Sequence, residues 1–282
     1  MNDLLGLMLE DSPVSADSGL NRWLRPRPHI DPPEGFSDAA LELARRGWLD
    51  RARAEYIGVM VARRLHGLLV DLNAPMDVQE LALMMQLQEQ QHTALCMACA
   101  RALGADGEVA FEIDELQQAR SPQPVDTQTW QMIAGTLACG EGVALALIGH
   151  AVSALPPSPF REALNGIAAD ESLHARLGEV LLQIMRAGQT EDWLPWPGDD
   201  VVRAFVEAYQ RQMRQRAVVE PDEAAAFDDP ALAAELVQLG IPPSEAFKAA
   251  YMHGVNVRIP RRFAHLGLPL STAVEDLSVA PE

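Results

Sequence analysis

The chain has 282 residues, 48% hydrophobic and 22% charged, which is ordinary for a folded globular protein and argues against wholesale disorder. Its formal net charge of -18 argues against nucleic-acid binding, because most of the surface would repel phosphate. Three cysteines are too few for a disulfide framework and suit a reducing cytosol.

The elements predicted along the chain are helices. Residues 1–36 are expected to form an arm, with a short apolar helix candidate at Leu4 to Leu9 followed by a Ser-, Asp- and Pro-rich stretch. Proline, glycine and capping residues then divide the chain into helical segments, with a break at Gly47 left open. The approximate ranges are 37–72, 77–103, 126–155, 158–187, 199–219, 230–239 and 244–255. No convincing alternating strand pattern appears.

Four of these segments are long, about 28–35 residues or roughly 40–50 Å at 1.5 Å per residue. Their length predicts an all-α fold, a four-helix bundle with additional C-terminal helices. We expect an N-terminal arm over 1–36, the bundle over 37–220, and a C-terminal helical extension over 221–282 packed on the bundle.

One segment is apolar enough to span a bilayer, from Met132 to Leu155. It carries Glu141 at its middle and also His150, and it has no Lys or Arg just before it. A buried core helix is therefore the better interpretation. The N-terminus lacks a positive region and a long apolar run, so no signal peptide is expected. These features predict a soluble, cytoplasmic protein that does not bind a membrane.

Two Glu-x-x-His motifs occur on long predicted helices. Each motif follows a helix that carries one Glu among apolar or small residues, so the pattern of a Glu and then a Glu-x-x-His is present twice. The six residues are Glu55, Glu89, His92, Glu141, Glu171 and His174. Residues at i and i+3 share one helix face, so the Glu and His of each motif can point together into the bundle.

Four carboxylates buried together repel one another, and each is costly to desolvate without a partner. Two divalent cations would neutralise them. Ligands of carboxylate oxygen and imidazole nitrogen, without thiolate, suit iron or manganese better than structural zinc. Asp170 is expected to accept from the ring of His92 across the bundle, and Gln88 is expected to serve His174. The alternative is that these are ordinary solvated residues, which would leave Glu141 in the core without a partner.

This set resembles the ligands of the ferritin-like di-iron carboxylate superfamily, over about Ser37 to Ala187. By that resemblance, Glu55 and Glu141 are the carboxylate ligands of the first and third long helices, one on each. The two Glu-x-x-His motifs complete two metal sites, with Glu bridging the ions. The resemblance implies two Fe ions, with Mn/Fe also open, and O2 as co-substrate.

The chain departs from several members of that superfamily. Cys96 stands where ribonucleotide reductase small subunits usually carry their radical tyrosine. Leu145 stands where methane monooxygenase hydroxylases have threonine, and Ile167 where arylamine N-oxygenases have a third histidine. The four-cysteine module of rubrerythrin is missing. The resemblance therefore names the superfamily and not the member.

The function favoured by these residues is a di-iron oxygenase or oxidase that hydroxylates, N-oxygenates or similarly oxidises a small organic substrate. Electrons would come from a separate ferredoxin or flavin reductase, since the chain shows no iron–sulfur or nucleotide motif. The alternatives are a ferroxidase or peroxidase that handles iron, and a bundle with a structural metal. A homodimer is compatible with the sequence.

Two glycines, Gly140 and Gly142, flank Glu141. Glycine inside a helix costs about 0.5–1 kcal/mol relative to alanine, so the pair indicates space for substrate or O2, a helix distortion, or close helix packing. The candidates for a substrate pocket are Met85, Cys96, Gly142 and Leu145. The basic group Arg258, Arg261, Arg262 and His265 is open to two interpretations: an anion or reductase site, or a solvated surface.

Overall fold

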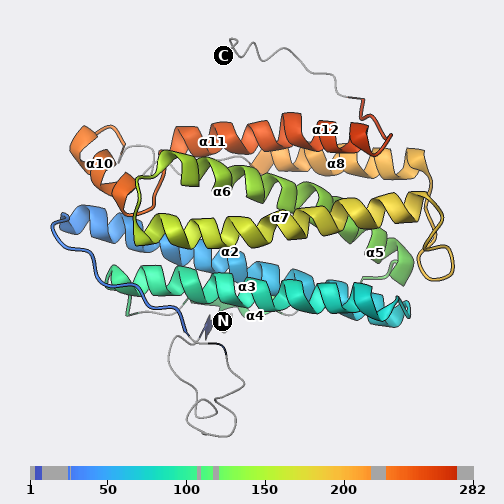
Figure 1. Ribbon diagram of the computed structural model, residues 1–282, viewed down its shortest axis with the longest axis horizontal. Helices are drawn as coiled ribbons and strands as arrows, with labels where there is room; N and C mark the ends of the chain where they lie inside the picture. Colours follow the sequence, from blue (N-terminus) through green and yellow to red (C-terminus); the bar gives the residue numbers. More distant parts are fainter. Residues whose placement is uncertain are drawn as a thin grey trace, which may run out of the picture.

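The computed structural model describes residues 4–7, 25, 27–106, 109–116, 121–216 and 227–271, which form a mainly helical protein (Figure 1). The helices are α2 (Asp38–Asp71), α3 (Met76–Ala102), α4 (Ile113–Leu116), α5 (Val125–Met132), α6 (Gly142–Ala154), α7 (Pro159–Arg186), α8 (Asp199–Arg216), α10 (Pro230–Gln238), α11 (Ser244–His253) and α12 (Ile259–His265). Two π-helical segments, η1 (Ile133–Glu141) and η2 (Gly254–Arg258), join α5 to α6 and α11 to α12.

Serine caps begin two of the long helices where the sequence predicts them. The Ser37 hydroxyl accepts from the backbone N–H of Ala40 at α2, and the Ser158 hydroxyl accepts from that of Arg161 at α7. Each hydroxyl satisfies a backbone donor that has no partner within its helix. The third long helix begins at Val125, one residue before the predicted range of 126–155, and Pro124 occupies its cap position. Gly47 does not interrupt α2.

The prediction of a helix at Leu4 to Leu9 is wrong. Leu4–Leu7 is a strand, β1, that pairs antiparallel with β2 (Val109–Glu112) in the connection after α3. A helix of so few residues cannot offset the cost of its own nucleation, whereas an extended segment gains ladder hydrogen bonds from a neighbouring edge. Residues 8 and 9 of the predicted helix lie outside the described residues.

The last helix also runs further than predicted. The segment expected to end near Val255 continues through η2 into α12 and ends at His265. Pro260 does not stop it; the proline is the second residue of α12 and follows directly on the π-helical segment η2. The Arg258 to His265 group therefore lies on a helix. The predicted residues 217–219 at the end of α8 lie outside the described residues.

The long helices pack lengthwise in pairs. α2 packs along α3, and the continuous α5–η1–α6 helix packs along α7 (Figure 1). α8 lies against η1, and α11 and η2 lie against α6. Among the described residues, Val125–Ala154 is a helix long and apolar enough to cross a membrane, and 61% of its most apolar window is buried inside the protein.

Two apolar cores lie one after the other along the helices. The first contains Leu65, Met85 and Leu181 from α2, α3 and α7, together with residues of η1 and α8. The second contains Trp48, Cys96 and Ile167 from the same three helices. The stretch between the two cores is where polar side chains occupy the interior, and it carries the functional site described below.

Gly240 and Trp48 fasten α10 to the start of α2. The Trp48 indole Nε1–H donates to the carbonyl oxygen of Leu239 at 2.9 Å. Gly240 has φ +87°, and a Cβ there would lie 2.8 Å from Trp48 Cζ2 and 2.9 Å from Phe160 Cβ. Glycine is needed here both for the backbone conformation and for the space.

Replacing Gly240 with alanine should destabilise the fold more than the same change at Gly188. Both residues have positive φ, but a Cβ at Gly188 would have nothing within 4 Å. The unfavourable conformation should cost about 1–2 kcal/mol at either position, and overpacking should add about 1–3 kcal/mol at Gly240 alone. Urea unfolding of both variants measures the difference, and equal losses would contradict the packing argument.

Candidate metal centre

The six Glu and His residues singled out by the sequence meet between the two apolar cores. Glu55 comes from α2, Glu141 ends η1, and the two motifs come from the middle of α3 and α7. Each of the six is at most 9% exposed. The structure thus brings these residues together in the interior, which excludes the alternative that they are scattered over solvated faces.

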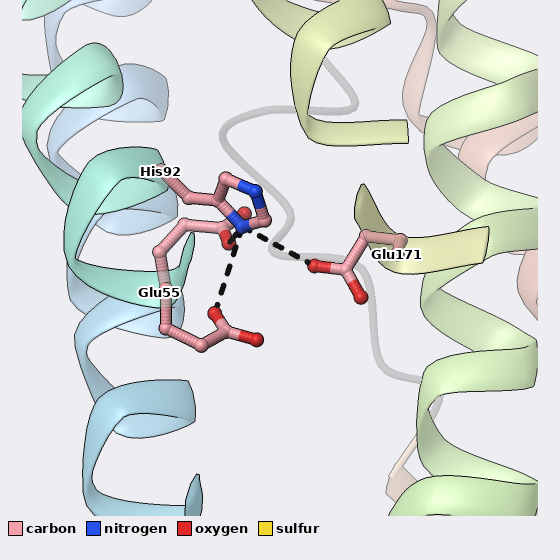
Figure 2. A group of neighbouring side chains, drawn as sticks. Glu55, His92 and Glu171 are labelled. Atoms are coloured by element: carbon pink, nitrogen blue, oxygen red, sulfur yellow. Dashed lines mark ion pairs between the residues drawn. The ribbon is translucent and has the colours of Figure 1, made fainter. Parts of the chain in front are cut away.

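The two imidazoles face a shared set of carboxylate oxygens. His92 Nδ1 lies 3.3 Å from Glu55 Oε2 and 3.6 Å from Glu171 Oε1 (Figure 2). It also lies 3.7 Å from Glu89 Oε2. His174 Nδ1 lies 3.2 Å from Glu89 Oε1 and 3.3 Å from Glu171 Oε2. Glu89 and Glu171 therefore each present one oxygen to one ring and the other oxygen to the other ring.

Two overlapping groups of donors result from this arrangement. The first consists of Glu55, Glu89, His92 and Glu171, and the second of Glu89, Glu141, Glu171 and His174. Within each group, one donor atom per residue lies within 4.8 Å of the others. Because Glu89 and Glu171 belong to both, the geometry is that of two adjacent cation sites joined by two carboxylates.

The outer nitrogens of both rings are tied to one hydrogen-bonded chain. Asp170 Oδ2 lies 3.1 Å from His92 Nε2, and Asp170 Oδ1 accepts from Gln88 Nε2 at 2.8 Å. Gln88 Oε1 lies 3.0 Å from His174 Nε2. The pairings are those expected from the sequence. Because an acceptor oxygen of Asp170 or Gln88 lies at each Nε2, both rings carry a proton on Nε2. A neutral ring then has its lone pair on Nδ1, which points into the cluster.

The inner atoms of the cluster have an unused capacity for bonding. His92 Nδ1, His174 Nδ1 and Glu171 Oε2 are buried and make no hydrogen bond of acceptable geometry within the protein. Buried polar atoms in native proteins nearly always have a partner. Two imidazole nitrogens and a carboxylate oxygen that converge without hydrogen bonds fit cation binding, and the oxygen-rich set without thiolate suits a hard or borderline divalent ion.

The pKa shifts show the charge imbalance in the cluster. Burial alone would lower the pKa of His92, but Glu55 and Glu89 outweigh it and raise the pKa to about 10. The pKa of His174 rises to about 9, because Glu171 and Glu89 outweigh burial in the same way. Burial, reinforced by the charge of Glu171, raises the pKa of Glu141 well above its usual value. The site therefore favours positive charge, as a cation-binding site must.

Gly58 makes room for one of the two shared carboxylates. It lies one turn after Glu55 on α2, and a Cβ at this position would lie 2.3 Å from Glu89 Oε2. Gly58 was not among the residues predicted from the sequence. The signal was a glycine inside a long helix, which is unfavourable unless packing requires it.

We expect Gly58→Ala to weaken divalent metal binding while leaving the helix intact. The added methyl group would push the Glu89 carboxylate out of both donor groups, and changes to residues that position a ligand commonly cost about 10–100-fold in metal affinity. Gly67→Ala is the matched control on the same helix, because its Cβ would meet nothing within 4 Å. Titration of both variants with Co2+ or Fe2+ measures the effect, and unchanged affinity in Gly58→Ala would show that Glu89 is not held this way.

The helix that carries Glu141 is distorted and braced from outside. Glu141 is the last residue of η1, and Arg262 Nη1 of α12 donates to the carbonyl oxygen of Ala138 at 2.5 Å. A Cβ on Gly142 would lie 2.6 Å from the same nitrogen. Gly142 thus leaves space for Arg262. Two of the three interpretations of the glycine pair are observed: a helix distortion, since Gly140 lies in η1, and close packing, since Gly142 meets Arg262.

Replacing Arg262 with methionine should loosen the π-helical turn and weaken binding at the donor group that contains Glu141. We expect about a tenfold loss for one of two metal equivalents, since the change acts through the helix and not on a ligand. Arg261→Met is the control, because Arg261 is exposed and adjacent. Metal titration with fluorescence or calorimetric detection reports the two equivalents separately; equal curves for the two variants would contradict a bracing role for Arg262.

The other residues named for a substrate pocket lie in the surrounding packing. Met85 and Cys96 are buried on either side of the cluster along α3, and Leu145 is half-buried on α6. Burial raises the pKa of Cys96 well above that of a free thiol, and it raises that of Cys99 and Cys139 to about 12, so all three are neutral thiols at neutral pH. Pocket lining by these residues stays a prediction.

No protein-family model matches this chain, and no curated protein matches it in sequence. The cluster is therefore interpreted as a candidate metal centre from its geometry alone.

Proposed function

We propose that this protein is a di-iron oxygenase or oxidase of the ferritin-like type, acting on a small organic substrate. One observation carries the proposal: two buried Glu/His donor groups share both Glu89 and Glu171. A structural metal needs one closed site, whereas paired sites with shared carboxylates suit chemistry that uses two ions. The helical pairing around the cluster supports the ferritin-like assignment.

The residues have distinct roles under this proposal. Glu89 and Glu171 hold both ions, Glu55 and His92 complete one site, and Glu141 and His174 complete the other. Asp170 and Gln88 fix the proton of each ring on Nε2, so that Nδ1 is the donor nitrogen. The two apolar cores on either side exclude water from the cluster.

Two bound ferrous ions would supply electrons to activate O2, and the activated oxygen would oxidise the substrate. An Mn/Fe pair fits the same donors. Reduction would come from a separate ferredoxin or flavin reductase, and the site of action would be the cytoplasm. The three cysteines are buried, neutral thiols. Among the described residues, no thiolate is therefore placed to hold an iron–sulfur cluster that could deliver electrons from within the chain, which supports an external donor.

Anaerobic Fe2+ titration tests the proposal. We expect two equivalents per chain, with both lost in Glu89→Ala and Glu171→Ala because each carboxylate belongs to both groups. The control is Glu80→Ala, an exposed glutamate on the same helix, which should bind two. Mössbauer spectroscopy of the loaded protein should show a coupled iron pair.

Oxygen consumption then separates the functions. An oxygenase or oxidase should consume O2 repeatedly with an artificial reductant and yield an oxidised product from a substrate panel. A ferroxidase would oxidise added Fe2+ without an organic product, and a storage protein would also assemble into a large cage on size exclusion. Binding of a single ion, or two ions without any reaction with O2, would overturn the proposal.

A further inference from the structure

Positive charge is concentrated in two helical segments. Residues 208–215 of α8 and residues 246–271, which include most of α11 and all of η2 and α12, contain none of the chain's 40 Asp and Glu residues and six of its 22 Lys and Arg residues. The net charge of these segments is therefore opposite in sign to that of the whole chain, which is -18. The six basic residues are Arg211, Arg214, Lys248, Arg258, Arg261 and Arg262.

The two segments lie side by side and form one surface, which we call the basic face. Arg214 Nε of α8 donates to Asn256 Oδ1 of η2 at 2.7 Å. Figure 1 shows α8 and the α11–α12 helix on the same side of the molecule. Arg258 and Arg261 are both exposed, and their spacing places them on one face of the helix. Neither of them forms an ion pair with a described residue, so both charges are available to a partner.

Most acids at the edges of the basic face are already bound within the protein. α6, against which α11 packs, has no Asp, Glu, Lys or Arg. Glu179, whose charge acts on Arg262, is paired with Arg176 at 3.0 Å. Glu245 is exposed at the start of α11, but it lies roughly 20 Å of helix from Arg258 at 1.5 Å per residue. The other pairs at the edges are Asp199 with Arg186 and Glu207 with Ser271.

Arg262 connects the basic face to the segment that carries Glu141. Its Nη1 donates to the carbonyl oxygen of Ala138, which lies in the last turn of η1 before Glu141. α8 also packs directly against η1. A protein bound on the basic face would therefore be separated from η1 by one layer of helices. Electron transfer slows steeply with distance, so a short separation from the metal centre suits an electron donor.

We propose that the basic face is the docking site of a small acidic electron-transfer protein of the ferredoxin class. The inference rests on the proposed function, which requires electrons from a separate carrier. Transient electron-transfer contacts are small, and complementary charge steers them. An acidic carrier would be attracted to the basic face and repelled by the acidic remainder of the chain, so the charge distribution would also orient it.

Extended polyanions fit this surface less well than a small protein does. Nucleic acid or an anionic bilayer would extend beyond the two segments and meet the acidic remainder of the chain. A weak protein complex buries less than about 600 Å² on each partner, which two helices can supply. Among the described residues of the basic face, Phe247 is the one large apolar side chain that is exposed, whereas membrane-binding helices present a whole apolar face.

Calorimetric titration of the purified full chain with an acidic [2Fe–2S] ferredoxin tests the docking site apart from any turnover. The complex should be one-to-one at low ionic strength and should be lost at roughly 1 M salt, where the Debye length is about 3 Å. Arg258→Glu combined with Arg261→Glu should weaken it about 10–100-fold, because repulsion replaces attraction. Replacing both residues with lysine keeps the charge and should preserve binding.

The matched control is Arg63→Glu combined with Arg101→Glu, which changes the net charge equally at exposed arginines on α2 and α3. It should leave ferredoxin binding intact. Each variant must show the wild-type circular dichroism spectrum, and Arg261→Glu alone is the milder change if the pair misfolds. Equal losses in the control would overturn the proposal, and so would wild-type binding that persists at high salt. Tighter binding to a DNA duplex or to phosphatidylglycerol vesicles would identify a different partner and overturn it too.

Oxygen consumption by the iron-loaded chain separates this inference from the proposed function. With reduced ferredoxin, the variant Arg258→Glu combined with Arg261→Glu should need about tenfold more ferredoxin for half-maximal rate. Its rate with a small artificial reductant, which needs no docking, should equal that of the wild type. Absence of O2 consumption with the artificial reductant would contradict the proposed function. Consumption with that reductant, but no binding of ferredoxin or no effect of the variant, would overturn the docking site alone.

Discussion

The structure depends on how four acids and two imidazoles coexist in an apolar interior. Buried carboxylates of like charge are tolerated only where positive charge stands among them. Here the raised pKa values of His92 and His174 express that demand, since each ring is drawn toward its cationic form by the acids around it. The apolar cores on either side increase the strength of these interactions, because few water molecules are available to screen them.

Helical spacing made much of this centre predictable from the sequence. A Glu and a His at i and i+3 on an apolar helix stripe both face the protein interior, so the duplicated pattern was sufficient to select all six residues. The partners of the rings followed by the same logic, since Asp170 and Gln88 each directly precede a motif glutamate on facing helices. The long helices and two of their serine caps were predictable because capping and proline signals are local in the chain.

Features that depend on contacts between distant segments were not predictable in this way. Leu4–Leu7 pairs with Val109–Glu112 because the fold brings the two segments side by side, and the residue pattern of neither segment alone indicates that pairing. Arg262, which donates to a carbonyl oxygen of the π-helical segment that ends at Glu141, lies far along the chain, and its local sequence shows only one of several arginines. Gly58 and Gly142 could be seen as unusual, but the atoms that fill their space belong to other helices.

The chain of contacts from His92 through Asp170 and Gln88 to His174 makes the two halves of the centre act as one. The Gln88 amide has one donating end and one accepting end, and both are in use. If the amide turned over, it would face Asp170 with an acceptor and His174 with a donor at the same moment, so neither contact can be lost singly. The orientation of one ring is thereby linked to that of the other, although the two rings belong to different donor groups.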